Sequence, residues 1–213
     1  MNSRERKENR IALFGGTFDP IHNGHLALAE AALSQLGVDE VVFIPTQLRY
    51  YKTTKLSTTA YDRASMVALA LEPYDRMRIS DMELCCPPEE NYTVNTLRKL
   101  KQEDPDRELI FLIGGDSLEH LGTWREPAEL FRLATFAAAV RDDVDPARAL
   151  DLIRGYEREY PGAKLELLTM EPKNISSTVI RERAAKGESL EGLVPAAVER
   201  YIVKQRLYLQ DRV

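Results

Sequence analysis

The stretch that decides the fold is residues 11–25, Ile-Ala-Leu-Phe-Gly-Gly-Thr-Phe-Asp-Pro-Ile-His-Asn-Gly-His. Its first four residues, Ile11 to Phe14, form an apolar run that stops at two glycines, which predicts a short buried strand. From His25 to Leu36 the apolar residues recur at helical spacing, and Gly37 is a typical helix end. The stretch therefore predicts a strand, a glycine-rich loop and a helix in succession.

The same alternation continues along the chain. We predict further strands at Val41–Ile44, Met77–Ser80, Leu109–Ile113, Phe136–Val140 and Leu165–Leu168. We predict further helices after a cap at Thr59 and at Thr93–Lys101, Pro146–Tyr160, Ser177–Lys186 and Pro195–Leu207. This order predicts an α/β fold, a Rossmann-like doubly wound parallel sheet with helices on both faces in a single domain. In such a sheet the ligand lies beyond the carboxyl ends of the strands.

The composition is that of one globular domain: 213 residues, of which 44% are hydrophobic and 30% charged. We expect residues 1–10 to be a polar, flexible N-terminal extension and residues 11–213 to form the domain. The sequence has no secretory signal and no apolar stretch of the ~20 residues that span a bilayer, so we expect a cytoplasmic protein with no membrane partner. The formal charge of −5 argues against nucleic acid as a partner.

The loop after the first strand has the features of an anion site. Gly15 and Gly16 let the backbone approach a ligand closely. His22 and His25 follow at a helix start, where unpaired N–H groups and the helix dipole favour anions, so we predict that both imidazoles face one phosphate. The alternative is a glycine turn with two incidental capping histidines. His120 has no such neighbours and is expected to be structural.

A second helix start carries similar chemistry, in residues 175–181, Ile-Ser-Ser-Thr-Val-Ile-Arg. Ser176 and Ser177 are good N-cap residues, and Arg181 lies one turn inside the helix. Alone, this is a capped helix with a surface arginine; together with the first segment, it predicts a second contact to a triphosphate. Neither Gly-Lys-Ser/Thr nor Gly-x-Gly-x-x-Gly occurs at the first glycines, which excludes a Walker-type loop and disfavours a dinucleotide-binding oxidoreductase.

These two motifs together resemble those of the bacterial nicotinate mononucleotide adenylyltransferases, nucleotidyltransferases that share (His/Thr)-x-Gly-His. The resemblance extends from about Ile11 to about Tyr208 and includes Tyr92-Thr93-Val94, residues 111–118 and Trp124. It implies transfer of AMP from ATP to the phosphate of nicotinate mononucleotide, which gives deamido-NAD and pyrophosphate in NAD biosynthesis. The partners that the resemblance implies are these two small molecules. Mg²⁺ is expected to be delivered with ATP, and no metal is expected to be held by the protein alone. A homo-oligomer is possible.

The resemblance also implies which residues form the site. The catalytic set that it implies is His22, His25, Lys52 and Arg181. ATP would be bound by the backbone of Gly15, Gly16, Thr17 and Phe18. It would also be bound by Gly114, Asp116, Ser176, Ser177 and Thr178. The pyridine mononucleotide would be bound by Tyr92, Thr93 and Trp124, where an aromatic wall suits a flat ring.

The chain departs from the family's pattern at two places. The family has Pro-Pro-His-Lys or Pro-Pro-His-Arg where this chain has Arg49-Tyr50-Tyr51-Lys52, so only the terminal cation is carried over. Asn95 stands where the family has an aspartate, and this amide is expected to relax discrimination between nicotinate and nicotinamide. The alternatives are the same reaction on nicotinamide mononucleotide or another phosphorylated acceptor, as in a phosphopantetheine adenylyltransferase, and a nucleotide-binding regulator without catalysis.

Overall fold

The computed structural model describes residues 9–47, 58–87, 90–140, 146–170 and 175–209. In this part of the chain six strands form one sheet in the order β3-β2-β1-β4-β5-β6, and all pairs are parallel. The strands are β1 (Arg10–Gly16), β2 (Glu40–Pro45), β3 (Met77–Ile79), β4 (Glu108–Gly114), β5 (Thr135–Val140) and β6 (Leu165–Thr169). The predicted doubly wound sheet is confirmed. Its strand order reverses between β1 and β4, which is where such sheets bind ligands.

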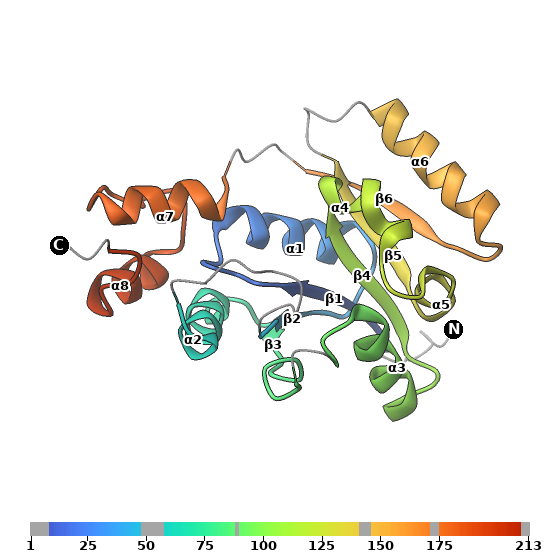
Figure 1. Ribbon diagram of the computed structural model, residues 1–213, viewed down its shortest axis with the longest axis horizontal. Coiled ribbons are helices and arrows are strands. Elements are labelled where there is room, and N and C mark those ends of the chain that lie inside the picture. Colours follow the sequence, from blue (N-terminus) through green and yellow to red (C-terminus); the bar gives the residue numbers. More distant parts are fainter. Residues whose placement is uncertain (1–8, 48–57, 88–89, 141–145, 171–174, 210–213) are drawn as a thin grey trace, which may run out of the picture.

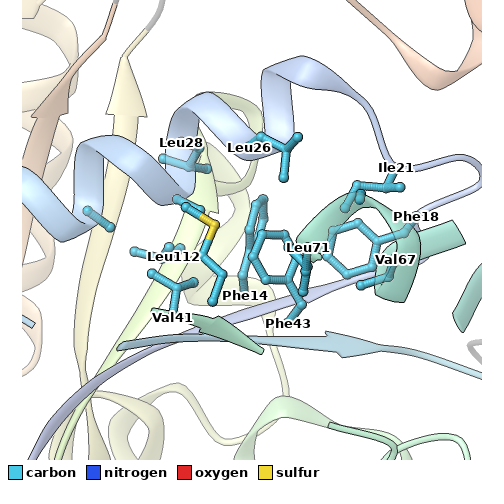
Figure 2. Packing of buried hydrophobic residues seen from close by; sticks show 14 of the residues in the cluster. Phe14, Phe18, Ile21, Leu26, Leu28, Val41, Phe43, Val67, Leu71 and Leu112 are labelled. Carbon is cyan, nitrogen blue, oxygen red and sulfur yellow. The ribbon is translucent and has the colours of Figure 1, made fainter. Parts of the chain in front are cut away.

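The helices cover both faces of this sheet (Figure 1). They are α1 (Asn23–Gln35), α2 (Ala60–Leu71), α3 (Thr93–Glu103), α4 (Gly115–His120), α5 (Pro127–Leu133), α6 (Pro146–Glu159), α7 (Ser177–Ala185) and α8 (Ala196–Lys204). Ala12 and Phe14 of β1 belong to the core under α1, α2, α7 and α8, part of which Figure 2 shows. The alternate residues Ile11 and Leu13 belong to the core under α3 to α6. Burial on both faces explains why the central strands β1, β2 and β4 are nearly continuous apolar runs.

The observed elements differ from the predicted ones mainly in two short helices and in the end of the last helix. The helices α4 and α5 were not predicted, because six and seven residues are too few to show helical periodicity. The last helix ends at Lys204 instead of Leu207, since Arg206 adopts a positive φ of 54° and the Leu207 N–H turns back to the Ile202 carbonyl.

The N-terminal end of β1 lies one residue before the predicted domain start. The Arg10 N–H donates to Asp39 Oδ2 (3.0 Å), so Arg10 already belongs to the sheet. Residues 1–8 lie outside the described residues, and the division into residues 1–10 and 11–213 stays a prediction. Among the residues that the structure describes, every helix is too short or too polar to span a bilayer.

Candidate active site

Two adjoining cavities open at the carboxyl ends of β1 and β4. One, the α1 cavity, has a volume of about 360 Å³ and lies at the starts of α1, α4 and α7. The other, the α3 cavity, has a volume of about 540 Å³ and lies at the start of α3. Gly15, Phe111 and Trp124 line both. A Cβ on Gly15 would lie 3.0 Å from Phe111 Cζ, so the wall between the cavities needs a glycine at this position.

The two histidines form a reciprocal cap at the start of α1. His22 is the N-cap, and its Nδ1 accepts from the His25 N–H (3.3 Å), while His25 Nδ1 accepts from the His22 N–H (3.2 Å). Their rings stack with centroids 3.6 Å apart, and both line the α1 cavity. Because each Nδ1 accepts, each neutral ring carries its proton on Nε2. The two interpretations of this pair, cap and anion contact, are therefore compatible.

Aromatic packing fixes the orientation of His25. Its ring stands edge to face against Phe14 and Phe18, with centroids 5.6 and 5.1 Å apart. Phe18 is buried and packs among Phe14 and Phe43 beneath α1 (Figure 2). Among the predicted loop residues, Gly15 lines the cavities, whereas the Phe18 side chain belongs to the core.

The second predicted segment, residues 175–181, also lies at the α1 cavity. Ser176 caps α7 and lines the α1 cavity with Ser177, whose Oγ donates to the Pro20 carbonyl (3.0 Å). Arg181 donates to the Asp19 carbonyl (2.7 Å) and to Thr178 Oγ1 (3.1 Å). Asp19 and Arg181 are 162 residues apart in the sequence. The predicted convergence of the two helix starts is thus present in the fold.

The end of β4 completes the α1 cavity. Gly114, Asp116 and Ser117 line this cavity, because α4 starts directly after β4. The predicted residues Gly114 and Asp116 are therefore in the same cavity as His22 and His25.

The predicted pyridine residues gather in the α3 cavity. Tyr92, Thr93 and Trp124 line it together with Arg125, whose Cζ lies 4.5 Å above the centre of the Tyr92 ring. Trp124 stands edge to face on Phe111, with centroids 6.1 Å apart. The cavity thus combines an aromatic wall with a guanidinium. His120, expected to be structural, is exposed and also lines it.

Of two further predicted features, one does not line either cavity in the described residues, and the other falls outside those residues. Asn95 Nδ2 donates to the Glu90 carbonyl (2.9 Å), and Asn95 is not among the described residues that line either cavity. The structure therefore offers no direct contact through which Asn95 would select the ring substituent. Lys52 lies outside the described residues.

Comparison with known proteins shows to which family the chain belongs. A model of the cytidylyltransferase-like family matches residues 13–183. A protein of Dehalococcoides mccartyi is 42% identical over 205 residues, covering 93% of this chain and 97% of that protein, and one of Synechococcus sp. is 37% identical over 209 residues, covering 98% and 99%. Both are named probable nicotinate-nucleotide adenylyltransferase. The chain belongs to the nicotinate-nucleotide adenylyltransferases, within the cytidylyltransferase-like family.

A solved structure supports the fold of this adenylyltransferase. The nicotinic acid mononucleotide adenylyltransferase of Plasmodium falciparum in complex with NaAD superposes with a TM-score of 0.75 at 21% identity, covering 94% of this chain and 97% of that one. The family resemblance drawn from the two motifs is confirmed by the relatives, and the fold by this structure.

One residue that shapes the adenylyltransferase site could not be predicted from the sequence. Arg63 of α2 is 1% exposed, and its guanidinium donates to the carbonyls of Thr17 (2.7 Å), Thr46 (2.6 Å) and Gln47 (3.2 Å). It thereby ties the loop after β1 to the loop after β2. Burial lowers the pKa of Arg63, and the nearby Asp19 carboxylate opposes this shift.

Asp19 is the centre of a second buried network. Its carboxylate is 4% exposed and accepts from Thr58 Oγ1 (2.6 Å) and from the Tyr208 hydroxyl (2.7 Å). Burial, together with the Asp19 charge, raises the pKa of Tyr208, so the phenol stays protonated and donates. The glycine-rich loop is therefore held from α2, α7 and the C-terminal segment.

Gly24→Ala tests how tightly His22 must be held. A Cβ on Gly24 would lie 3.0 Å from His22 Nδ1 and 3.1 Å from its Cε1, and the His22 ring is buried and stacked. We expect kcat of the adenylyltransferase to fall about tenfold, because small displacements of a positioned group are costly. Thermal stability should change little, since the helix preference of alanine offsets the strain at the His22 ring.

Gly155→Ala in α6 is the matched control, since nothing lies within 4 Å of its Cβ. It should keep full activity. A Gly24→Ala enzyme with unchanged steady-state kcat would contradict the assigned position of His22.

Proposed function

We propose that this adenylyltransferase transfers AMP from ATP to the phosphate of nicotinate mononucleotide, releasing pyrophosphate. The observation that carries the proposal is the meeting of two cavities at Gly15, one lined by paired imidazoles and helix starts, the other by an aromatic wall. ATP would occupy the α1 cavity and the mononucleotide the α3 cavity. The high identity of relatives with this name supports the same reaction.

The proposed mechanism is a direct displacement. An oxygen of the acceptor phosphate attacks the α-phosphorus of ATP, a new P–O bond forms, and the bond to the bridging oxygen of pyrophosphate breaks. The acceptor is already an anion near neutral pH, so no general base is needed. Catalysis then consists of alignment and of donors aimed at the transferring group.

The residue roles follow from where charge develops. We propose that His22 and His25 donate from Nε2 to the phosphate oxygens, and that the start of α7 with Ser176 and Ser177 holds the distal phosphates. Gly114 and Asp116 would contact the adenosine. Arg181 and Thr178 would support the distal phosphate site through the Asp19 backbone, and Lys52 would add a cation from the loop after β2.

Mg²⁺ is proposed to arrive with ATP, because this ion keeps several waters and binds largely through substrate phosphates. When bound, it neutralises the charge of the triphosphate. In the described part of the chain no three His, Cys, Asp or Glu side chains come together, and Asp19 already accepts two hydroxyls. Asp116, at the α1 cavity, is a carboxylate that could add one ligand.

Pyrophosphate release tests the proposal. The enzyme, ATP and Mg²⁺ are mixed with nicotinate mononucleotide, nicotinamide mononucleotide or phosphopantetheine, and pyrophosphate is measured over time. We expect turnover with the first compound and, at most, slower turnover with the second. Binding of ATP without pyrophosphate release from any acceptor would instead support a regulator. A cytoplasmic location, expected from the sequence, remains part of the proposal.

Arg125→Gln tests the preference for a nicotinate over a nicotinamide ring. The Arg125 guanidinium lies at the ring cavity over Tyr92, and its Nε is 3.7 Å from Glu126. It is positioned to attract a carboxylate on the pyridine, although the buried carboxylate of Glu83 also lines this cavity. We expect kcat/KM for nicotinate mononucleotide to fall about tenfold, as for a lost hydrogen bond to a charged group, and that for nicotinamide mononucleotide to change little.

The control is Arg154→Gln, which removes an exposed arginine of α6 that pairs with Asp151. It should leave both substrates unaffected. Equal losses for both mononucleotides in Arg125→Gln would show that Arg125 does not select the carboxylate.

A further inference from the structure

A residue at the α3 cavity carries a buried hydroxyl that has no hydrogen-bond partner in the described part of the chain. Thr46 follows β2 directly and is 4% exposed, and it lines the cavity beside Gly15. Its Oγ1 is buried and has no hydrogen-bond partner among the residues that the structure describes. A buried hydroxyl left unpaired is destabilising, so Thr46 is an unfavourable feature of the ligand-free protein.

The backbone on both sides of this hydroxyl is fixed. The Thr46 N–H donates to the Gly16 carbonyl (2.9 Å), and the Thr46 carbonyl accepts from the buried Arg63 guanidinium (2.6 Å). Two other buried threonines differ from it. Thr58 Oγ1 donates to Asp19 and Thr96 Oγ1 donates to Glu83, each at 2.6 Å. Thr46 is therefore held in place at the wall of the cavity, and its hydroxyl has an unused hydrogen bond among the described residues.

A second residue that lines this cavity, Asn91, also has a buried polar atom without a partner among the described residues. Asn91 Nδ2 donates to the Glu83 carbonyl (3.1 Å), which fixes the orientation of the amide. Asn91 Oδ1 is buried and, within the described residues, has no partner. This oxygen can only accept, so it suits a hydroxyl donor and not an anion.

We propose that Thr46 Oγ1 donates a hydrogen bond to the phosphate of the acceptor mononucleotide and so positions the attacking oxygen. The inference rests on the proposed function, because that phosphate has to lie at the wall which the two cavities share. Gly15 forms this wall, and Thr46 is hydrogen-bonded to the next residue, Gly16. Asn91 Oδ1 faces a hydroxyl of the ribose in this arrangement.

The test compares Thr46→Val, which removes the hydroxyl at nearly constant volume, with Thr46→Ser, which keeps it. Affinities for nicotinate mononucleotide and for nicotinate riboside, which lacks the phosphate, are measured without ATP. The fluorescence of Trp124 reports binding, as it is the chain's sole tryptophan and lines both cavities. We expect Thr46→Val to weaken mononucleotide binding about tenfold, or about 1.4 kcal/mol. Riboside binding should stay unchanged, and Thr46→Ser should restore the affinity.

Thermal stability separates a binding role from a structural one. Without ligand, Thr46→Val should raise the Tm by about 2 °C, because a buried unpaired hydroxyl is removed. The matched variant Thr96→Val removes a hydroxyl that is paired and should lower the Tm. A lower Tm in Thr46→Val would assign the hydroxyl to the fold and overturn the inference.

Two further outcomes would also overturn the inference. One is an unchanged affinity of Thr46→Val for the mononucleotide. The other is an equal loss of affinity for the riboside, which would place the contact on the ribose. The pyrophosphate assay on the unmodified enzyme is independent of these measurements. If that enzyme turns over while Thr46→Val binds normally, the inference fails and the proposed function stands. If the unmodified enzyme binds the mononucleotide but releases no pyrophosphate, the proposed function fails, and the comparison of the two ligands still decides the role of Thr46.

Discussion

Replacing His25 by alanine is expected to lower kcat about 100- to 1000-fold, as the loss of a donor to a developing charge does in other enzymes. His25 lines the α1 cavity, and its Nδ1 accepts the His22 N–H, which leaves the proton of the neutral ring on Nε2. Its ring also holds that of His22 by stacking at 3.6 Å. The variant therefore removes one donor and loosens a second. Steady-state kinetics with ATP and nicotinate mononucleotide measure the effect.

The same substitution removes one of the two hydrogen bonds of the reciprocal cap at His22. This loss costs up to about 1 kcal/mol of stability, so it has to be separated from the loss of a donor. Thr59→Ala is the matched control. Thr59 caps α2 in a reciprocal pair with Asp62, and it does not line either cavity in the described residues. Thr59→Ala should lose a similar free energy of unfolding and keep its turnover. Turnover of His25→Ala within tenfold of the unmodified enzyme would remove His25 from the catalytic set.

The parts of the site that could be predicted are those that local sequence determines. A strand that ends in two glycines, followed by histidines three residues apart, predicts a helix start. Helices that follow parallel strands start at the carboxyl edge of the sheet, where ligands bind. His22 and Ser176 were found in this way, and both line the α1 cavity. A role that depends on side-chain direction was less predictable: Asn95 turns to the Glu90 carbonyl. The burial of the Phe18 side chain does not contradict its prediction, which concerned only the Phe18 backbone.

Arg63 could not be found from the sequence for a different reason. It lies in the first turn of an amphipathic helix, next to Asp62, where a charged residue normally faces solvent. Its burial arises because the loops after β1 and β2 bring three carbonyls to one point, and these carbonyls belong to residues 16 to 46 positions away in the chain. A contact of this kind depends on the assembled fold, and no local pattern encodes it.

Arg63→Met is expected to reduce the free energy of unfolding by about 3–5 kcal/mol, as when one partner of a buried ionic network is removed. The carbonyls of Thr17 and Thr46 would lose their donor, and the buried carboxylate of Asp19 would lose its nearby cation. The midpoint of thermal unfolding should fall by about 10 °C. Urea unfolding measures the loss of free energy of unfolding. Arg63→Lys should give an intermediate loss, because lysine keeps the charge but lacks the planar guanidinium.

A double variant identifies which loss dominates. If the uncompensated charge of Asp19 is the main cost, Asp19→Asn in the Arg63→Met background should recover part of the stability, so that the two substitutions together cost less than their sum. If the unpaired carbonyls dominate, the two losses should add. Loss of less than about 1 kcal/mol in Arg63→Met, the range of an exposed ion pair, would mean that the guanidinium does not hold the two loops together.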